Sequence, residues 1–205
     1  MVDQEALHQA LVRVLGAAGV LEGDDIGPAY FEDISHERSG WPWLVLRPSS
    51  TAEVAQCLRL CHRYGQAVVP QGGMTGLVSA GVPIDGELVL STQRLARIEE
   101  VDASNATITA QAGVTLQQVQ EAADAAGYFF PLDIGSRGSC TVGGNLSTNA
   151  GGNRVLRYGM MRDLVLGLEA VLADGTVIDG THKMVKNNAG YDLKHLFVGT
   201  EGTLG

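Results

Sequence analysis

Glycine is concentrated in one stretch of this chain, and that stretch limits the folds the chain can adopt. Six of the 27 glycines lie between residues 135 and 152. Helices and strands tolerate few glycines, because glycine loses more conformational freedom on folding than any other residue. The stretch therefore predicts backbone in unusual conformations, or backbone that another group approaches closely.

The same stretch carries uncharged polar side chains, which can both donate and accept hydrogen bonds. Burying such groups without partners would cost about 1–3 kcal/mol each. We therefore expect a long polar ligand at this segment; a solvated flexible loop is the alternative. The candidate contacts are Pro131, Asp133, Gly135, Ser136, Thr141, Gly143, Gly144, Asn145, Ser147, Thr148, Asn149, Gly151 and Gly152.

A second glycine-rich turn follows the apolar segment 67–70. Three glycines in five residues directly after a strand form a nest of backbone N–H groups that can surround an anion. The turn is neither a Walker loop nor the Rossmann fingerprint, because the residues that define those motifs are missing. A tight structural turn is the alternative. The candidate contacts are Pro70, Gln71, Gly72, Gly73, Met74, Thr75 and Gly76.

Hydrophobic periodicity predicts an α+β chain with a mixture of parallel and antiparallel strands. The succession of strand, helix and strand between residues 43 and 70 implies a small parallel sheet with a right-handed crossover. The turn at Asp174-Gly175 predicts a hairpin. The expected helices are 3–18, 52–64 and 116–126, and the expected strands are 43–46, 67–70, 88–90, 98–101, 107–110, 164–172 and 177–178.

The charge balance argues against several kinds of partner. The chain has 205 residues, 14 basic and 23 acidic side chains, and a net charge of −9. Nucleic-acid and anionic-membrane surfaces depend on clustered Lys and Arg, so we expect neither partner. No apolar run approaches the roughly 18 residues of a spanning helix, and residues 1–5 are unlike a secretory signal. We expect a cytoplasmic protein.

Four ordered motifs between residues 40 and 205 resemble the flavoproteins grouped with vanillyl-alcohol oxidase, whose FAD domain is called the PCMH type. Residues 70–76 resemble that family's first pyrophosphate loop, and residues 131–152 resemble the segment that lies along its ribityl chain and flavin ring. Residues 157–159 match its R-Y-G element, which adds Tyr158 to the candidate contacts. Residues 188–205 are similar to the segment near the adenosine end, which adds Glu201 and Gly202.

The resemblance implies a PCMH-type fold of two α+β subdomains, one with the small parallel sheet and one mostly antiparallel, with extended FAD between them. Residues 1–39 would be a helical lead-in and residues 40–205 the FAD-binding domain. Family members that bind FAD covalently have a histidine at the position of Met74. Because this chain has methionine there, the resemblance implies non-covalent FAD. They also continue into a substrate domain with a divalent metal, which would lie beyond residue 205 together with the unidentified catalytic base.

The resemblance also implies a reaction, in which a hydride moves from C2 of a D-2-hydroxy acid to flavin N5 and leaves a 2-oxo acid. The motif wording is most similar to the members that oxidise D-2-hydroxyglutarate, while D-lactate and glycolate dehydrogenases share most of it. The implied electron acceptor is an electron-transfer flavoprotein or a quinone, and a homodimer is left open. The alternatives are an NADPH-using reductase of cell-wall precursor synthesis and a non-catalytic FAD-binding or electron-transfer module.

Overall fold

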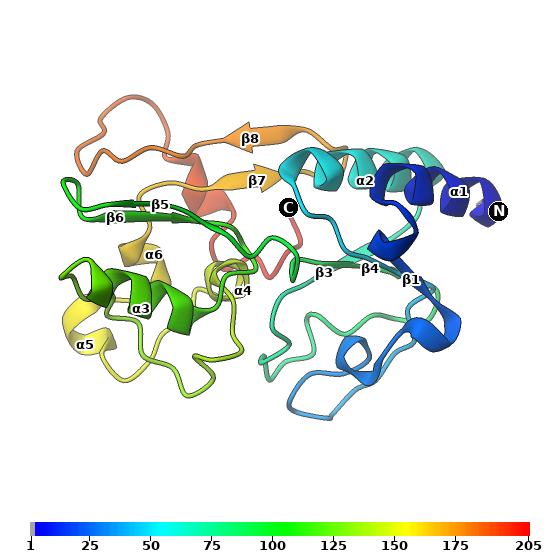
Figure 1. Cartoon of the computed structure of the whole chain (residues 1–205), viewed down its shortest axis with the longest axis horizontal. Helices are drawn as coiled ribbons and strands as arrows, with labels where there is room; N and C mark the ends of the chain where they lie inside the picture. Colours follow the sequence, from blue (N-terminus) through cyan, green and yellow to red (C-terminus); the bar gives the residue numbers. More distant parts are fainter. Residues whose placement is uncertain (1–2) are drawn as a thin grey trace.

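The computed structural model describes residues 3–205, which form two halves with their own sheets (Figure 1). The first half contains a four-stranded sheet in the order β1-β2-β4-β3. Strands β2, β4 and β3 are parallel, and β1 pairs antiparallel with β2 at the edge. Its elements are α1 (Gln4–Leu15), β1 (Val20–Glu22), β2 (Leu44–Leu46), α2 (Thr51–Tyr64), β3 (Val68–Gln71) and β4 (Leu88–Ser91).

The helices α1 and α2 pack side by side over this sheet and bury its apolar residues. Leu7 and Leu11 of α1 share one core with Cys57 and Cys61 of α2 and with the strands. Helix α2 begins at a Ser50 cap, whose hydroxyl accepts from the N–H of Glu53. Because α1 and β1 belong to this core, residues before 40 pack as part of the first half; the boundary at residue 39 stays a prediction.

Strand β4 lies at the centre of the parallel sheet, between β2 and β3. All of its residues are buried, which is typical of a parallel strand covered on both faces. Strand β1 was not expected from the sequence, because residues 20–22 lie in a region rich in Gly, Pro and charge. It forms because Val20 and its neighbours pair with β2 in register.

The second half is built from two antiparallel ribbons and several short helices (Figure 1). One ribbon pairs β5 with β6, and the other pairs β7 with β8. The predicted fold class, α+β with a small parallel sheet and antiparallel strands, is therefore confirmed. The elements are β5 (Ile98–Asp102), β6 (Thr107–Ala110), α3 (Leu116–Ala125), α4 (Val142–Ser147), α5 (Val155–Tyr158), α6 (Met161–Leu164), β7 (Glu169–Val171), β8 (Val177–Asp179) and the 3-10 turn η4 (Leu193–Leu196).

The single long strand expected over 164–172 is wrong. Residues 161–164 form the helical turn α6, and the strand β7 begins only at Glu169. The Asp163 carboxylate accepts the N–H of Met160 at 2.8 Å and so starts the turn. Met161 and Leu164 pack in a core beneath it, so tertiary burial, rather than strand propensity, decides this segment.

The two halves touch where α2 meets the β7–β8 hairpin. The Thr51 hydroxyl donates to the Glu169 carboxylate at 2.5 Å, and the Arg59 guanidinium donates to the carbonyl of Gly175 at 3.2 Å. Gly175 has φ 81° and lies so close to the backbone of Ala55 that a Cβ would not fit. Among residues 3–205, no helix is both long and apolar enough to cross a membrane.

Candidate cofactor site

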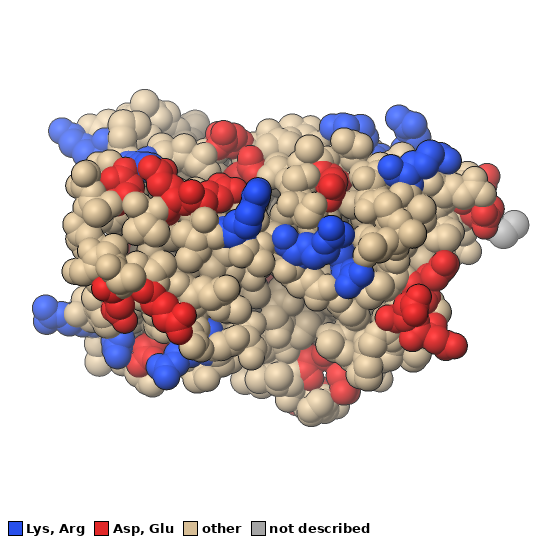
Figure 2. Space-filling model, in the orientation of Figure 1, with Lys and Arg blue, Asp and Glu red and all other residues tan. Residues whose placement is uncertain are grey.

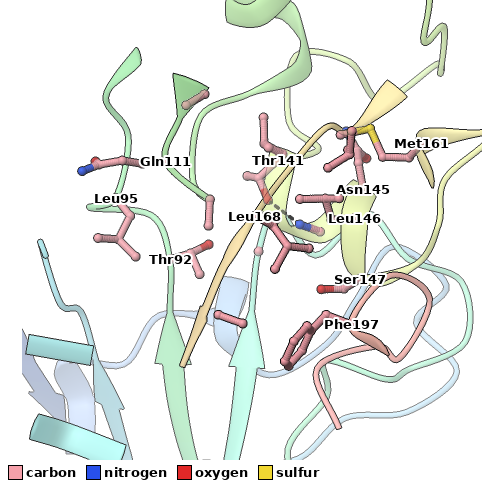
Figure 3. A pocket seen from close by; sticks show the side chains of 18 of the residues that line it. Thr92, Leu95, Gln111, Thr141, Asn145, Leu146, Ser147, Met161, Leu168 and Phe197 are labelled. Carbon is pink, nitrogen blue, oxygen red and sulfur yellow. Dashed lines mark hydrogen bonds between the residues drawn. The ribbon is translucent and has the colours of Figure 1, made fainter. Parts of the chain in front are cut away.

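A cleft of about 1840 Å³ runs between the two halves. It is lined by β3 and the loop after it, by the β5–β6 ribbon, by α4, by β7 and by the C-terminal segment. Thr92, Thr141, Asn145, Ser147 and Phe197 converge on it from these elements (Figure 3). Its volume exceeds the roughly 300–1,000 Å³ of an ordinary small-molecule site, so it has room for a ligand larger than most small molecules.

Most of the predicted contact residues line this cleft. They come from three separate stretches of sequence that the fold brings to one place. The stretches are residues 70–76, 131–151 and 201–202. The lining residues are Pro70, Gln71, Gly72, Gly73, Met74, Thr75, Gly76, Pro131, Ser136, Thr141, Gly143, Gly144, Asn145, Ser147, Thr148, Gly151, Glu201 and Gly202.

The loop after β3 presents a continuous row of unpaired backbone donors. In residues 3–205, every N–H from residue 72 to residue 78 lacks a hydrogen-bond partner. The loop is held from behind instead, because the carbonyl of Met74 accepts the N–H of Ile34 at 3.2 Å. Met74 itself has φ 51°, a left-handed conformation that is uncommon for a residue with a Cβ. Such a row of free amides fits the phosphate oxygens of a dinucleotide.

The side chain of Gln71 braces this loop from behind. Its amide nitrogen donates to the carbonyls of Tyr30 and Gly81, at 3.1 and 2.7 Å, and the residue is only 2% exposed. These two acceptors fix which end of the amide is the nitrogen, and they leave its oxygen without a partner in the described chain. The carboxamide oxygen is therefore the polar atom of Gln71 that lacks a partner, whereas its main-chain carbonyl accepts from both the N–H and the hydroxyl of Thr92.

Gly72 and Gly73 are glycines because two protein segments meet there. A Cβ on Gly72 would lie 2.6 Å from the Thr141 hydroxyl oxygen, and one on Gly73 would lie 2.9 Å from the carbonyl carbon of Ser139. The sequence predicted close approach of a ligand at these positions. The structure adds a second reason: the two glycine-rich stretches pack against each other, backbone to backbone.

The stretch expected to be an irregular loop contains the short helix α4. The Thr141 hydroxyl caps it by accepting the N–H of Gly144 at 3.3 Å, and the N–H groups of Val142 and Gly143 bond to the carbonyls of Val114 and Ala112. Main-chain donors of α4 are thus used within the protein. What α4 offers the cleft is side chains: in the described chain, neither the Ser147 hydroxyl nor the carboxamide oxygen of Asn145 has a partner.

Free main-chain donors in the second stretch lie before α4. No N–H from residue 132 to residue 136 has a hydrogen-bond partner within residues 3–205. Gly135 has nothing within 4 Å of a Cβ position, so its backbone is open to the surroundings. The second stretch therefore combines a short donor segment with polar side chains of a helix, rather than one extended loop.

Five predicted contacts lie outside the cleft lining, and four of them have contacts within the protein. The Asp133 carboxylate pairs with Arg154 at 3.6 Å, and Asn149 accepts the N–H of Arg162 at 3.0 Å. Gly152 lies against the carbonyl of Asp133, and the Tyr158 ring meets Phe129 edge-on at 5.9 Å. Their contact with a cofactor stays a prediction. The five are Asp133, Gly135, Asn149, Gly152 and Tyr158.

The C-terminal segment closes the cleft beside both glycine-rich stretches. The N–H of Glu201 donates to the carbonyl of Ser147 at 2.9 Å. Gly202, with φ 78°, lies so close to the Pro70 ring that a Cβ would collide with it. The first and the last of the motif segments, residues 70–76 and 188–205, are therefore in contact with each other.

Other lining residues could not be identified from the sequence. Thr92, Leu95, Gln111, Met161 and Leu168 also line the cleft (Figure 3). Each lies at the end of an ordinary apolar or polar segment with no motif of its own. Only the pairing of strands and the packing of the two halves place them here.

Charged side chains at the margin of the cleft pair with one another. The Lys183 ammonium lies 2.8 Å from Asp102 and 2.7 Å from Glu100. Its hydrogen bond, followed by those from Asn105, holds the pKa of Asp102 well below the usual range of a carboxyl, and the two carboxylates raise the pKa of Lys183. On the face shown in Figure 2, small groups of basic side chains alternate with acidic ones. The described residues contain no cluster of His, Cys, Asp and Glu suited to a metal ion.

A family model described as "FAD binding domain" matches residues 42–181, which is more than half of the chain. The chain belongs to this family. FAD is accordingly its cofactor, as the sequence predicted, and the free amides at 72–78 suit the pyrophosphate of FAD. Non-covalent attachment stays a prediction.

Curated relatives are similar along nearly the whole chain. A probable D-2-hydroxyglutarate dehydrogenase of Oryza sativa subsp. indica is 46% identical over 94% of this chain. D-2-hydroxyglutarate dehydrogenase of Bos taurus is 44% identical over 96% of it, and a putative D-lactate dehydrogenase of Schizosaccharomyces pombe is 44% identical over 86%. The chain spans about a third of these relatives, 34%, 36% and 34% of their lengths.

These relatives correct one expectation. The sequence predicted a cytoplasmic protein, but the relatives of Oryza sativa, Bos taurus and Arabidopsis thaliana are named as mitochondrial proteins. The expectation of a cytoplasmic protein is therefore wrong. It rested on the polar N-terminus and on the lack of a long apolar run, neither of which distinguishes one aqueous compartment from another.

Solved structures of other enzymes have the same fold. An alkyldihydroxyacetonephosphate synthase matches 98% of this chain and 38% of its own length, with a TM-score of 0.87 and 22% identity. The 6-hydroxy-D-nicotine oxidase of Arthrobacter nicotinovorans matches 78% of this chain and 34% of its own, with a TM-score of 0.66 and 24% identity. At this identity the likeness establishes the fold alone.

Proposed function

We propose that this chain is the FAD-holding part of an enzyme that oxidises a D-2-hydroxy acid to the 2-oxo acid, with D-2-hydroxyglutarate as the preferred substrate. The observation that carries the proposal is the 44–46% identity to dehydrogenases named for that substrate in Oryza sativa and Bos taurus. D-lactate is the second candidate, supported by the similar identity to the Schizosaccharomyces pombe protein.

In the proposed enzyme this chain binds and orients the cofactor. The backbone N–H groups of residues 72–78 would hold the pyrophosphate, where each charge-assisted hydrogen bond contributes roughly 1.5–3 kcal/mol. The free carboxamide oxygen of Asn145 and the hydroxyl of Ser147 would meet donors and acceptors further along the cofactor. When bound, FAD supplies the oxidising chemistry by accepting a hydride from the substrate.

The remaining contacts of the proposed reaction belong outside residues 1–205. We propose that the rest of the longer protein supplies the base that takes the hydroxyl proton, most substrate contacts and a divalent metal. The electrons would then pass to an electron-transfer flavoprotein or a quinone. A homodimer remains compatible with this arrangement.

The test is to express the full-length protein and measure reduction of an artificial dye with D-2-hydroxyglutarate, D-lactate and D-malate. We expect D-2-hydroxyglutarate to give the highest kcat/KM. Dye reduction by none of the three would refute the proposal. Bleaching of the flavin by NADPH instead would favour a reductase, and stable FAD binding without any turnover would favour a binding or electron-transfer module.

A further inference from the structure

Arg162 joins its own helix α6 to two other segments, one through its guanidinium and one through its backbone N–H. One of its nitrogens donates to the carbonyl of Val198 at 2.7 Å, and another lies 2.9 Å from Nδ1 of His195. The backbone N–H of Arg162 donates to the Asn149 carboxamide oxygen at 3.0 Å. In the part of the chain that the structure describes, Arg162 has no carboxylate partner, and it does not line the cleft.

The contact with His195 indicates which nitrogen of that ring accepts a hydrogen bond. A guanidinium has only donors, so Nδ1 of His195 must accept and Nε2 must carry the hydrogen. Nε2 lies 3.4 Å from the carboxylate of Asp192, which is a suitable acceptor. The Lys194 ammonium pairs with the same carboxylate. The ring is therefore held between a donor on α6 and an acceptor on its own segment.

The segment that Arg162 holds contains three residues with left-handed backbone. Gly199, Glu201 and Gly202 all have positive φ, at 87°, 54° and 78°. Left-handed backbone is uncommon for a residue with a Cβ, such as Glu201, and persists only where the surroundings enforce it. Two further hydrogen bonds help: Gly199 and Glu201 donate to the carbonyls of Leu146 and Ser147, at 3.1 and 2.9 Å.

These contacts place the end of the segment on the cofactor cleft. Val198, whose carbonyl Arg162 holds, is only 3% exposed, and three residues later Glu201 and Gly202 line the cleft beside Pro70. Figure 1 shows the same segment, in red, running past α4 at the centre of the molecule. Arg162 is thus linked to the cleft through a short, strained piece of backbone.

We propose that Arg162 is a positioning residue for FAD binding, which acts by fixing residues 195–202 as one wall of the cleft. The inference rests on the proposed binding role of Glu201 and Gly202, and it adds a residue that touches no cofactor itself. His195 serves as the acceptor that orients the guanidinium. Loss of either partner frees the strained segment, and the cofactor then has to order it on binding.

The test measures two quantities in the protein and its variants. Arg162→Ala is expected to weaken FAD binding about 10- to 100-fold, since an ordered contact of this kind contributes about 1.5–3 kcal/mol. It is also expected to speed hydrogen exchange at the N–H groups of Gly199 and Glu201 in the FAD-free protein. Flavin fluorescence titration gives the first quantity, and mass spectrometry of exchanged peptides gives the second.

The control is Arg47→Ala, which removes an arginine whose guanidinium also donates to the carbonyl of another segment, that of Ala18, but which lies within the first half and does not line the cleft. We expect that variant to leave both quantities within twofold of the wild type. His195 gives a test that does not depend on how well Arg162→Ala folds. His195→Asn keeps an acceptor at the position of Nδ1 and should retain FAD affinity, whereas His195→Leu should lose it.

Unchanged FAD affinity in Arg162→Ala, or equal affinities in the two His195 variants, would overturn the inference. Faster exchange with unchanged affinity would overturn it too, because the segment would then matter to the fold and not to the cofactor. None of these results depends on hydroxy-acid turnover, so failure of the dye assay and failure of this test are distinct outcomes.

Discussion

Two glycines of the loop after β3 separate internal packing from ligand contact. A Cβ on Gly73 would overlap the carbonyl oxygen of Ser139 and would lie 2.9 Å from its carbonyl carbon and 3.1 Å from Cα of Cys140, whereas ordinary contacts begin at 3.4 Å. A Cβ on Gly76 would meet nothing within 4 Å. The same substitution, glycine to alanine, should therefore have different consequences at positions three residues apart.

The cost at Gly73 follows from what the new methyl group would strike. Overpacking costs about 1–3 kcal/mol, and backbone on both sides cannot turn away as a side chain can, so we expect about 2–3 kcal/mol. In a chain of this size 1 kcal/mol changes Tm by roughly 2–4 °C. Gly73→Ala should therefore lower Tm by about 4–12 °C, while Gly76→Ala should change stability by no more than about 0.5 kcal/mol.

At Gly76 we expect an effect on FAD binding rather than on stability. Gly76→Asp adds a carboxylate beside the free N–H groups of residues 72–78, where we place the pyrophosphate of FAD. Loss of one charge-assisted hydrogen bond, about 1.5–3 kcal/mol, predicts FAD binding weaker by about 10- to 100-fold. Gly27→Asp is the matched control, because Gly27 also has open space around it but lies outside the cleft.

Calorimetry of the FAD-free protein measures the first effect, and flavin fluorescence titration measures the second. A Gly73→Ala variant with the Tm of the wild type would show that the two glycine-rich stretches are not in the contact described here. Full FAD affinity in Gly76→Asp would show that the row of free amides does not hold the phosphates, and the cofactor would then have to lie elsewhere.

Three further predictions concern charge, thiols and the cofactor. Lys183→Met should lower the free energy of unfolding at pH 7. The difference should shrink as pH falls below about 4, because a lowered carboxyl pKa stabilises the fold only while Asp102 is ionised; urea unfolding that gave a constant difference from pH 7 to pH 2 would contradict this. Burial raises the pKa of Cys57 and of Cys61 to about 12, so iodoacetamide at pH 8 should label them only after denaturation, and labelling at the rate of a free thiol would argue against their burial. FAD at about 1,000 times its Kd should add roughly 4 kcal/mol, which raises Tm by about 8–16 °C; an unchanged Tm would mean that the native cleft does not bind it.

Local sequence signals were sufficient for the helices of the first half and for the glycine-rich turn. Helix α2 follows from Ser50 as a cap and from Gly65 in a left-handed conformation at its end. Likewise, α1 follows from the recurrence of leucine at every fourth position, Leu7, Leu11 and Leu15, and from Gly16 at its C-terminal end. These signals act within a few residues, so a single sequence contains them. The same is true of the glycines that let residues 72–76 form an open turn.

Tertiary contacts decided what the local signals left open. Residues 142–147 became a helix because Thr141 caps them and because Val114 and Ala112 accept their first N–H groups. Residues 161–164 left the expected strand for a turn that buries Met161. The caps at Thr141 and Asp163 are local. The carbonyls that accept from residues 142 and 143, and the core that buries Met161, come from segments distant in sequence, and no short-range pattern predicts them.

The sequence by itself indicated two glycine-rich stretches as the candidate site and FAD as the cofactor that suits them. Only the tertiary structure decided that Gly72 and Gly73 allow these two stretches to pack against each other, and that the backbone N–H groups of residues 72–78 stay free. It also decided that Arg162 contacts the segment 195–202. The physical reason is that a glycine permits close approach without specifying what approaches. Which group approaches each glycine is decided only when the two halves pack against each other.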